Sequence, residues 1–379
     1  MKPSVLVLGA GFGGLELCTT LSEALGENLA ITLIDQSDSF MLGFSKLDVL
    51  FGRASADSLR LPYAEFVKPG VSFKREIIRA IDPAERRVTT DQGTHSADVL
   101  VVALGADYDA AATRGLELGV NEFYTIEGAI HLGGVLPTFK KGHAVVGLCG
   151  APYKCPPAPS ECVLMLHDYL SERGVRGDCH LTLVHTLPSP VPPSPETSRA
   201  LISAFAERGI EFLPGRRVDA IDAVKKSITL DDGRQLPCDL FLGVAKHRSP
   251  EVVIAAGLTD EKGWVTVNPQ TLATPFPNVY AIGDLANTAG APKAGVFAEG
   301  TARTVATNLM AGFRGQEQTA KYPGAGSCYI EFGADRIARV DVDFFSGPKP
   351  TGTFNEPSVA LRADKKKFGD TRRARWFGR

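Results

Sequence analysis

A glycine-rich turn near the start of the chain has the residue types and spacing that bind a pyrophosphate. The apolar run at 5–8 is followed by Gly9, Gly11 and Gly14 in the pattern G-x-G-x-x-G. Glycines at this spacing permit a tight turn and a close approach of backbone to ligand, and the following helix offers free N–H groups. Asp35 ends the next apolar run, where an acidic residue binds ribose hydroxyls. These residues predict a dinucleotide site.

A second copy of this motif has lost its glycine pattern. Residues 144–159 begin as a similar apolar strand but continue with Pro152, Cys155 and Pro156. Proline lacks the N–H donor that a pyrophosphate needs, and His185 stands where a ribose-binding acid is expected. The sequence therefore predicts poor binding of NADH and an electron donor of another kind. Cys155 is a candidate nucleophile in its thiolate form.

A third element identifies the dinucleotide. Residues 274–282 form a strand-like run that ends in Gly283 and Asp284. This ending is typical of flavoproteins that hold the ribityl phosphate of FAD. Gly105 follows the apolar run at 99–104 and lets backbone approach a ligand. We expect FAD as the cofactor, and we predict no metal site.

An internal repeat indicates the fold. The segment 80–105 recurs at 220–243, and each copy is a strand, a glycine turn and a strand that ends in glycine. The spacing predicts an α/β fold with two Rossmann-like, glutathione reductase-type domains, one inserted in the other, plus a small C-terminal segment. We expect an FAD-binding domain of residues 1–107 and 246–315, a degenerate NAD-type domain of residues 108–245, and a C-terminal interface or tail region of residues 316–379.

The order of these motifs resembles the pyridine nucleotide-disulfide oxidoreductase superfamily over nearly the whole chain. Within it, Lys-Cys-Pro-Pro-Ala-Pro-Ser-Glu at 154–161 and Gly-Ser-Cys-Tyr at 326–329 are similar to the branch of sulfide:quinone oxidoreductases and flavocytochrome c sulfide dehydrogenases. The resemblance implies that Cys155 and Cys328 lie above the flavin and handle sulfide sulfur. It also implies that Lys293 lies near the pyrimidine edge of the flavin, where it helps a helix N-terminus to stabilise the reduced ring.

The cysteine pair leaves neighbouring residues with open roles. Hydrosulfide can attack a disulfide to give a persulfide and a free thiolate, from which electrons can pass to a flavin. Glu161 is a candidate general base for this chemistry, although a carboxylate there can also simply open the following helix. Cys149 and Cys162 flank the loop and remain lesser candidates for the role of Cys155.

Two departures from the branch qualify the resemblance. No cysteine occupies 37–50, where the flavocytochrome members attach their flavin covalently, so we expect FAD to bind noncovalently. Tyr124 stands near the place where some quinone reductases of this group have a third cysteine.

Composition limits the function classes. The chain has 379 residues, a net charge of −2 and 44% hydrophobic residues, which is typical of a globular protein and excludes a global affinity for nucleic acid. The sequence lacks an apolar run of about 18 residues that would span a membrane. Its seven scattered cysteines do not suggest a secreted disulfide framework, so we expect a cytoplasmic protein.

The last 18 residues suggest a contact surface. The segment 362–379 is strongly basic, with Phe368, Trp376 and Phe377 interleaved. Such a tail can bind the inner face of a membrane peripherally, or it can be a terminal helix packed on the flavin domain. Both interpretations stay open.

We expect an FAD-dependent enzyme that oxidises sulfide, or a small thiol or persulfide, through Cys155 and Cys328 and passes electrons to a quinone. One alternative is a flavoprotein subunit that docks a cytochrome. Another is an NADH:quinone reductase, which would need an intact second glycine motif. Assembly into a homo-oligomer is left open.

Overall fold

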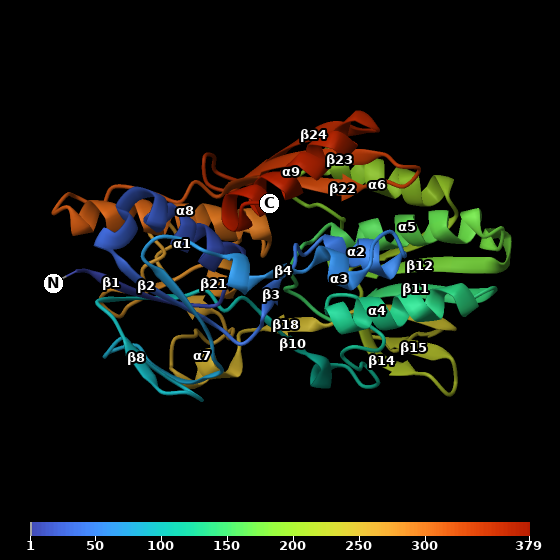
Figure 1. The fold of residues 1–379 in the computed structure, drawn as a ribbon. Helices are drawn as coiled ribbons and strands as arrows, with labels where there is room; N and C mark the ends of the chain where they lie inside the picture. The colour runs from blue at the N-terminus through green and yellow to red at the C-terminus, as the bar shows by residue number, and fades with distance from the viewer. Residues whose placement is uncertain (1) are drawn as a thin grey trace.

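The computed structural model describes residues 2–379 and contains two parallel sheets, each with helices packed against it (Figure 1). The first sheet has the order β20-β9-β1-β2-β5, and all its pairings are parallel. Its strands are β1 Ser4–Leu8, β2 Ala30–Asp35, β5 Val71–Arg75, β9 Val99–Val102 and β20 Val279–Ala281. Strand β1 lies between two neighbours, and its Val-Leu-Val-Leu run is buried on both faces, as a central parallel strand requires.

Two long helices cover this first sheet. They are α1 Phe12–Leu25 and α8 Gly295–Phe313, and they pack directly on each other. Helix α1 begins immediately after Gly11, so the glycine turn joins the carboxyl end of β1 to a helix N-terminus. This places the predicted dinucleotide turn at the edge of the sheet where ligands bind in such folds.

The second sheet has the order β13-β12-β11-β17 and is also parallel. Its strands are β11 Gly142–Leu148, β12 Cys179–His185, β13 Ile210–Pro214 and β17 Leu240–Val244. The accompanying helices are α4 Ile126–Val135, α5 Ala158–Glu172 and α6 Pro195–Glu207. The predicted fold class, with two Rossmann-like sheets, is confirmed.

The repeat seen in the sequence forms two matching antiparallel meanders. One contains β6 Ile78–Asp82, β7 Arg87–Thr90 and β8 Thr94–Ser96, and the other β14 Val218–Asp222, β15 Ser227–Leu230 and β16 Gln235–Pro237. Between the sheets the chain crosses twice, through β10 Asp107–Asp109 and β18 Lys246–Arg248, which pair with each other. The domain boundaries at 107, 245 and 315 stay a prediction.

The C-terminal region is a three-stranded antiparallel sheet followed by a helix. The strands are β22 Ala325–Glu331, β23 Ile337–Asp343 and β24 Thr351–Ser358, and the helix is α9 Ala360–Phe377. The remaining short elements are β3 Ser39–Phe40, β4 Leu61–Pro62, β19 Val265–Thr266, β21 Ala286–Asn287, α2 Ser45–Leu50, α3 Ala56–Leu59 and α7 Glu251–Ala255. Across residues 2–379, the structure has no helix whose length and hydropathy would suit a membrane span.

Helix α9 packs its aromatic end against α1 rather than presenting it to solvent. Trp376 is 1% exposed, its Nε1 donates to Glu16 Oε2 at 2.9 Å, and Phe377 is buried beside it. Arg375 Nε also donates to Glu16 at 2.9 Å, and Arg372 holds the buried Glu299 of α8. Of the two interpretations left open for the tail, the structure therefore supports core packing for Trp376 and Phe377, because both rings are buried.

Candidate active site

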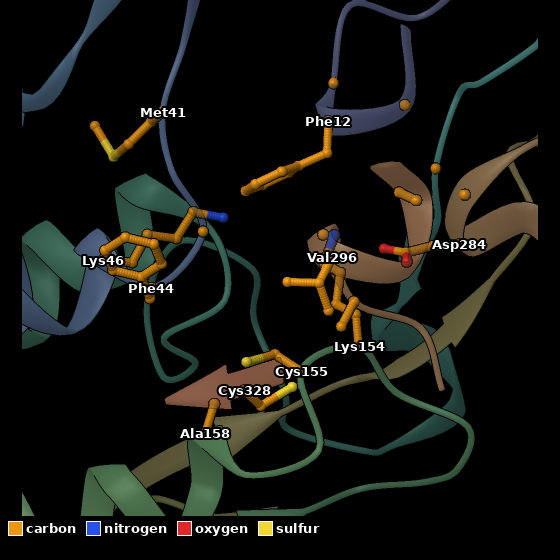
Figure 2. Close-up of a pocket in the computed structure, with 18 of the residues that line it drawn as sticks. Phe12, Met41, Phe44, Lys46, Lys154, Cys155, Ala158, Asp284, Val296 and Cys328 are labelled. Carbon is orange, nitrogen blue, oxygen red and sulfur yellow. The ribbon is translucent and has the colours of Figure 1, made fainter. Parts of the chain in front are cut away.

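A cavity of about 340 Å³ brings most of the predicted site residues together (Figure 2). It is lined by the turns that follow β1, β9 and β20, by the segment from Phe40 to Leu47, by the loop before α5 and the start of that helix, by the start of α8, by β22 and by α9. Among the predicted residues, those that line it are Gly11, Gly105, Cys155, Glu161, Gly283, Asp284 and Cys328. Four other predicted residues lie outside the wall: Gly9, Gly14, Asp35 and Lys293. They shape or hold the backbone of the turns that line the cavity.

The glycine turn is built to leave space for a ligand. Gly9 has a φ of +98°, and a Cβ on Gly14 would lie 1.9 Å from the carbonyl oxygen of Gly9, so both positions require glycine. A Cβ on Gly11 would meet no protein atom within 4 Å, because Gly11 faces the cavity. Helix α1 has neither a side-chain cap nor an acid in its first turn, which leaves its N–H groups available to an anion.

Asp35 supports this turn directly. Its Oδ2 accepts a hydrogen bond from the N–H of Ala10 at 2.7 Å, and its Oδ1 accepts one from Ser37 at 2.8 Å. The carboxylate at the end of β2 therefore fixes the glycine loop. Open space above Gly11, free N–H groups and a carboxylate at the next strand together fit the pyrophosphate and ribose of a dinucleotide.

The start of α8 and the Gly283-Asp284 turn form the part of the wall beside the glycine turn, where a Cβ on Gly295 would lie 2.8 Å from the Phe12 ring. Gly283 has a φ of +77°, and burial raises the pKa of Asp284, against the effect of two nearby lysines. Gly295 and Val296, in the first turn of α8, line the cavity wall. Lys293 donates from Nζ to the carbonyl oxygen of Asp284. Its position near the flavin edge stays a prediction.

The two cysteines come from distant segments and lie next to each other on the cavity wall (Figure 2). Cys155 lies in the loop before α5 with a φ of +53°, and its N–H donates to the carbonyl oxygen of Lys293 at 2.7 Å. Cys328 lies in the middle of β22, paired with Val340. Both are free thiols in this structure.

In this state both cysteines stay protonated, because their thiol pKa values are raised. Burial raises the pKa of Cys155 well above its ordinary value and that of Cys328 to about 12, and the nearby Glu161 acts in the same direction. Burial also raises the pKa of Glu161 to about 7, while Lys365 opposes this shift. A carboxyl group that titrates near neutrality therefore lies beside two thiols that do not ionise unaided.

The other candidate cysteines do not reach this site. Cys149 and Cys162 are buried, and neither contributes to the cavity wall. Tyr124, the residue near the position of a third cysteine, does line the cavity, and its hydroxyl lies 3.4 Å from the carbonyl oxygen of Cys155.

The sequence did not identify an aromatic and cationic wall around the same cavity. The ring centroids of Phe44 and Phe368 lie 6.1 Å apart with the ring planes tilted by 58°, and the Tyr329 ring lies edge-on to Phe368 at 5.7 Å. Lys365 of α9 reaches across to Glu331, with Nζ and Oε1 at 2.6 Å. Only the position of α9 against β22 brings these residues together, so no local sequence pattern could reveal them.

The second nucleotide motif is filled by the chain itself. At the carboxyl ends of β11 and β12, the Tyr153 hydroxyl and His185 Nε2 lie 3.0 Å apart, and the two residues are 4% and 0% exposed. Burial lowers the pKa of His185, so this pair is neutral at physiological pH. Two buried side chains therefore lie at the carboxyl ends of β11 and β12, the edge of a sheet at which dinucleotides bind in such folds.

Comparisons with known proteins agree with this geometry. Residues 3–307 match the family model described as pyridine nucleotide-disulphide oxidoreductase. The chain is 25% identical to the mitochondrial sulfide:quinone oxidoreductase of Mus musculus over 372 residues, which cover 93% of this chain and 80% of that protein. It is 24% identical to the type II NADH:quinone oxidoreductase of Staphylococcus aureus over 303 residues, covering 75% of this chain and 74% of that one.

A solved structure gives the same result for the fold. The X-ray structure of the sulfide:quinone oxidoreductase from Aquifex aeolicus superimposes with a TM-score of 0.87 at 24% identity, covering 97% of this chain and 90% of that one. The resemblance inferred from the sequence motifs is thereby confirmed.

Proposed function

The chain belongs to the pyridine nucleotide-disulphide oxidoreductase family, and within it we propose an FAD-dependent enzyme that oxidises sulfide, or a small thiol or persulfide, and passes the electrons to a quinone. One observation carries this proposal. A single cavity joins Cys155 and Cys328 to a dinucleotide-binding turn and to an aromatic wall. The names of the similar proteins, sulfide:quinone oxidoreductases, support the same substrate and acceptor.

The residues present fit FAD. Gly9, Gly11 and Gly14 would hold its pyrophosphate, Asp35 its adenosine ribose, and the turn at 283–284 its ribityl phosphate. When bound, FAD supplies an acceptor for two electrons beside the cysteine pair. Noncovalent binding is part of the proposal, because the cavity wall between Phe40 and Leu47 contains no cysteine.

The cysteine pair suits sulfur transfer. Hydrosulfide would attack one sulfur of a Cys155–Cys328 disulfide, so that a new S–S bond forms a persulfide while the old bond breaks and releases the other cysteine as a thiolate. That thiolate is costly in a site where burial raises both thiol pKa values. Glu161, with a pKa of about 7, can supply or remove a proton at these sulfurs.

The aromatic wall suits a flat electron acceptor. Phe44, Phe368 and Tyr329 offer ring faces and edges to a planar molecule. The Lys365 ammonium, held by Glu331, lines the same space and can donate a hydrogen bond to a quinone oxygen. The neutral Tyr153–His185 pair argues against NADH as the electron donor.

Anaerobic mixing tests the proposal directly. Flavin absorbance is followed after the purified protein is mixed with sulfide or, separately, with NADH, and a water-soluble quinone is then added. We expect sulfide to bleach the flavin and the quinone to restore the absorbance. Rapid, saturable bleaching by NADH, or no response to sulfide, would contradict the proposal.

A further inference from the structure

Three lysines lie in the cavity wall or next to it without an ion-pair partner, and of these Lys293 is the one outside the wall. Lys46 lies on α2, Lys154 precedes Cys155 and Lys293 precedes α8. Within the described residues 2–379, no carboxylate oxygen lies within 4.0 Å of their Nζ atoms. A fourth lysine in the wall differs, because Lys365 is paired with Glu331. Unpaired ammonium groups in a closed site are costly unless something else supplies negative charge.

Lys46 and Lys154 reach the cavity from different elements and from opposite sides (Figure 2). Lys46 Nζ donates to the carbonyl oxygen of Tyr124 at 2.5 Å. Lys154 Nζ donates to the carbonyl oxygen of Ala106 at 3.3 Å and lies 4.6 Å from the centroid of the Tyr108 ring. An ammonium has three donors, so the carbonyl held by Lys46 leaves two of its N–H groups for an occupant.

The nearest acids are already engaged or shifted toward neutrality. Glu122 accepts hydrogen bonds from the N–H groups of Tyr124 and Thr125 at 2.7 and 2.9 Å. Burial raises the pKa of Asp284, although Lys154 and Lys293 oppose this shift. These carboxyl groups therefore do not neutralise the lysines by direct contact.

The pKa shifts of groups near Lys154 agree with an accumulation of positive charge in this part of the wall. Burial, and then repulsion by Lys154, lowers the pKa of Lys46 to about 8. The same two causes lower the pKa of His247 to about 3, so this imidazole stays neutral. Burial also opposes the charge of Lys154, but Tyr108 and Asp284 outweigh it and raise its pKa. Both lysines are therefore largely protonated at pH 7.

We propose that Lys46 and Lys154 are positioning residues that hold negative charge on the reduced flavin and so raise the reduction potential of bound FAD. The inference rests on the proposed function, because it requires FAD in this cavity. The oxidised ring is neutral, and uptake of two electrons with one proton leaves one negative charge on it. Cations in a site that excludes water therefore stabilise the reduced ring more than the oxidised one.

The test measures the midpoint potential of bound FAD, with a reference dye and a reductant other than sulfide. Lys46→Met and Lys154→Met should each shift the reduction equilibrium at least about tenfold toward the oxidised form, which is about 30 mV for a two-electron couple. Lys46→Arg and Lys154→Arg keep the charge and should restore most of the potential. Lys366→Met is the matched control, because Lys366 is 76% exposed and pairs with Asp370 away from the cavity.

Each outcome decides the inference. If the lysines only brace the carbonyl groups of Tyr124 and Ala106, the Met variants lose thermal stability but keep the wild-type potential, and the inference is wrong. If a Met variant does not fold, the Arg variant must still retain the wild-type potential. A wild-type protein that binds no FAD overturns the proposed function and this inference together. A flavin-loaded protein with unchanged potentials overturns this inference alone.

Discussion

Glu161 accepts a hydrogen bond on Oε1 from the backbone N–H of Glu331 at 3.0 Å. This bond joins the first turn of α5 to β22, the two elements that flank the cysteine pair. A carboxylate that is only a helix-opening residue would face solvent, whereas Glu161 is 2% exposed. Its position therefore favours proton transfer over simple helix capping.

Glu161→Gln should slow flavin reduction by sulfide roughly 10²–10⁴-fold, the usual loss when a general acid or base is removed. The glutamine can still accept from Glu331 N–H, so FAD binding should be unchanged. Stopped-flow reduction between pH 5 and 9 measures the effect. Near-normal rates at all pH values would leave Glu161 structural.

The same variant has a pH-dependent effect on stability. Because burial raises the pKa of Glu161 from 4.5 to about 7, the folded protein binds a proton more tightly than the unfolded chain. Stability from this group is present below pH 4.5 and is lost as the pH rises toward 7. Glu161→Gln should therefore gain up to about 3 kcal/mol relative to wild type between pH 5 and 8, measured by denaturant unfolding. A difference that does not vary with pH would contradict the shift.

Cys155→Ser and Cys328→Ser should each abolish reduction by sulfide while FAD stays bound, because either change prevents the proposed disulfide from forming. Matched controls are Cys149→Ser and Cys162→Ser, at buried positions outside the cavity wall. The measurement is the flavin bleaching rate together with the flavin-to-protein ratio. If a Cys155 or Cys328 variant keeps its rate and a control loses it, the cysteine assignment must change.

The sequence could predict those parts of the site that depend on local geometry. Glycine spacing after an apolar strand determines the turn at 9–14, and the same reasoning found Asp35 and Gly283. It could not identify Lys365 or Phe368, because their roles depend on how α9 lies across β22. Packing energy between distant segments decides that arrangement.

Residues 362–379 show the same limit of prediction from sequence. Its basic and aromatic composition left membrane contact and core packing open, and the partner of Trp376 proved to be Glu16, at the other end of the chain. Arg372 and Trp376 are four residues apart, so they share the helix face that meets α8 and α1. No sequence pattern within residues 362–379 predicts those partners.

Gly11→Val should remove FAD without unfolding the protein. A Cβ on Gly11 meets no protein atom within 4 Å, and Gly11 lines the cavity, so a side chain there would extend into the space assigned to the pyrophosphate. We expect a colourless protein with a cooperative thermal transition, whereas acid precipitation of wild type should release free FAD. Gly177→Ala, at an exposed position that is also free of contacts within 4 Å, is the control. Flavin that precipitates with the wild-type protein would show covalent attachment.

NADH should reduce the flavin poorly, because Tyr153 and His185 are buried against each other beside the second nucleotide motif and Pro152 and Pro156 remove N–H donors from its loop. Stopped-flow mixing with NADH should show slow bleaching without saturation. Saturable reduction at micromolar NADH would instead favour an NADH:quinone reductase.

The exposed basic residues of α9 remain as a predicted contact with an anionic membrane. Lys366 and Lys367 are exposed, and Lys366 pairs only with Asp370 on its own helix. Each basic residue near an anionic surface contributes roughly 1 kcal/mol. Lys366→Glu together with Lys367→Glu should therefore weaken binding to anionic vesicles by about tenfold or more, and added salt should weaken wild-type binding similarly.

This double variant tests the membrane contact more cleanly than removal of residues 362–379. Such a deletion would also take away Lys365 and Trp376 and leave the buried Glu16 and Glu299 with Arg303 as their one shared ion-pair partner, so it should destabilise the cavity wall. Vesicle sedimentation and thermal unfolding are measured on wild type and the double variant, and we expect equal stability with unequal sedimentation. Equal sedimentation would mean that α9 is purely structural, and the electrons would then leave to a soluble acceptor.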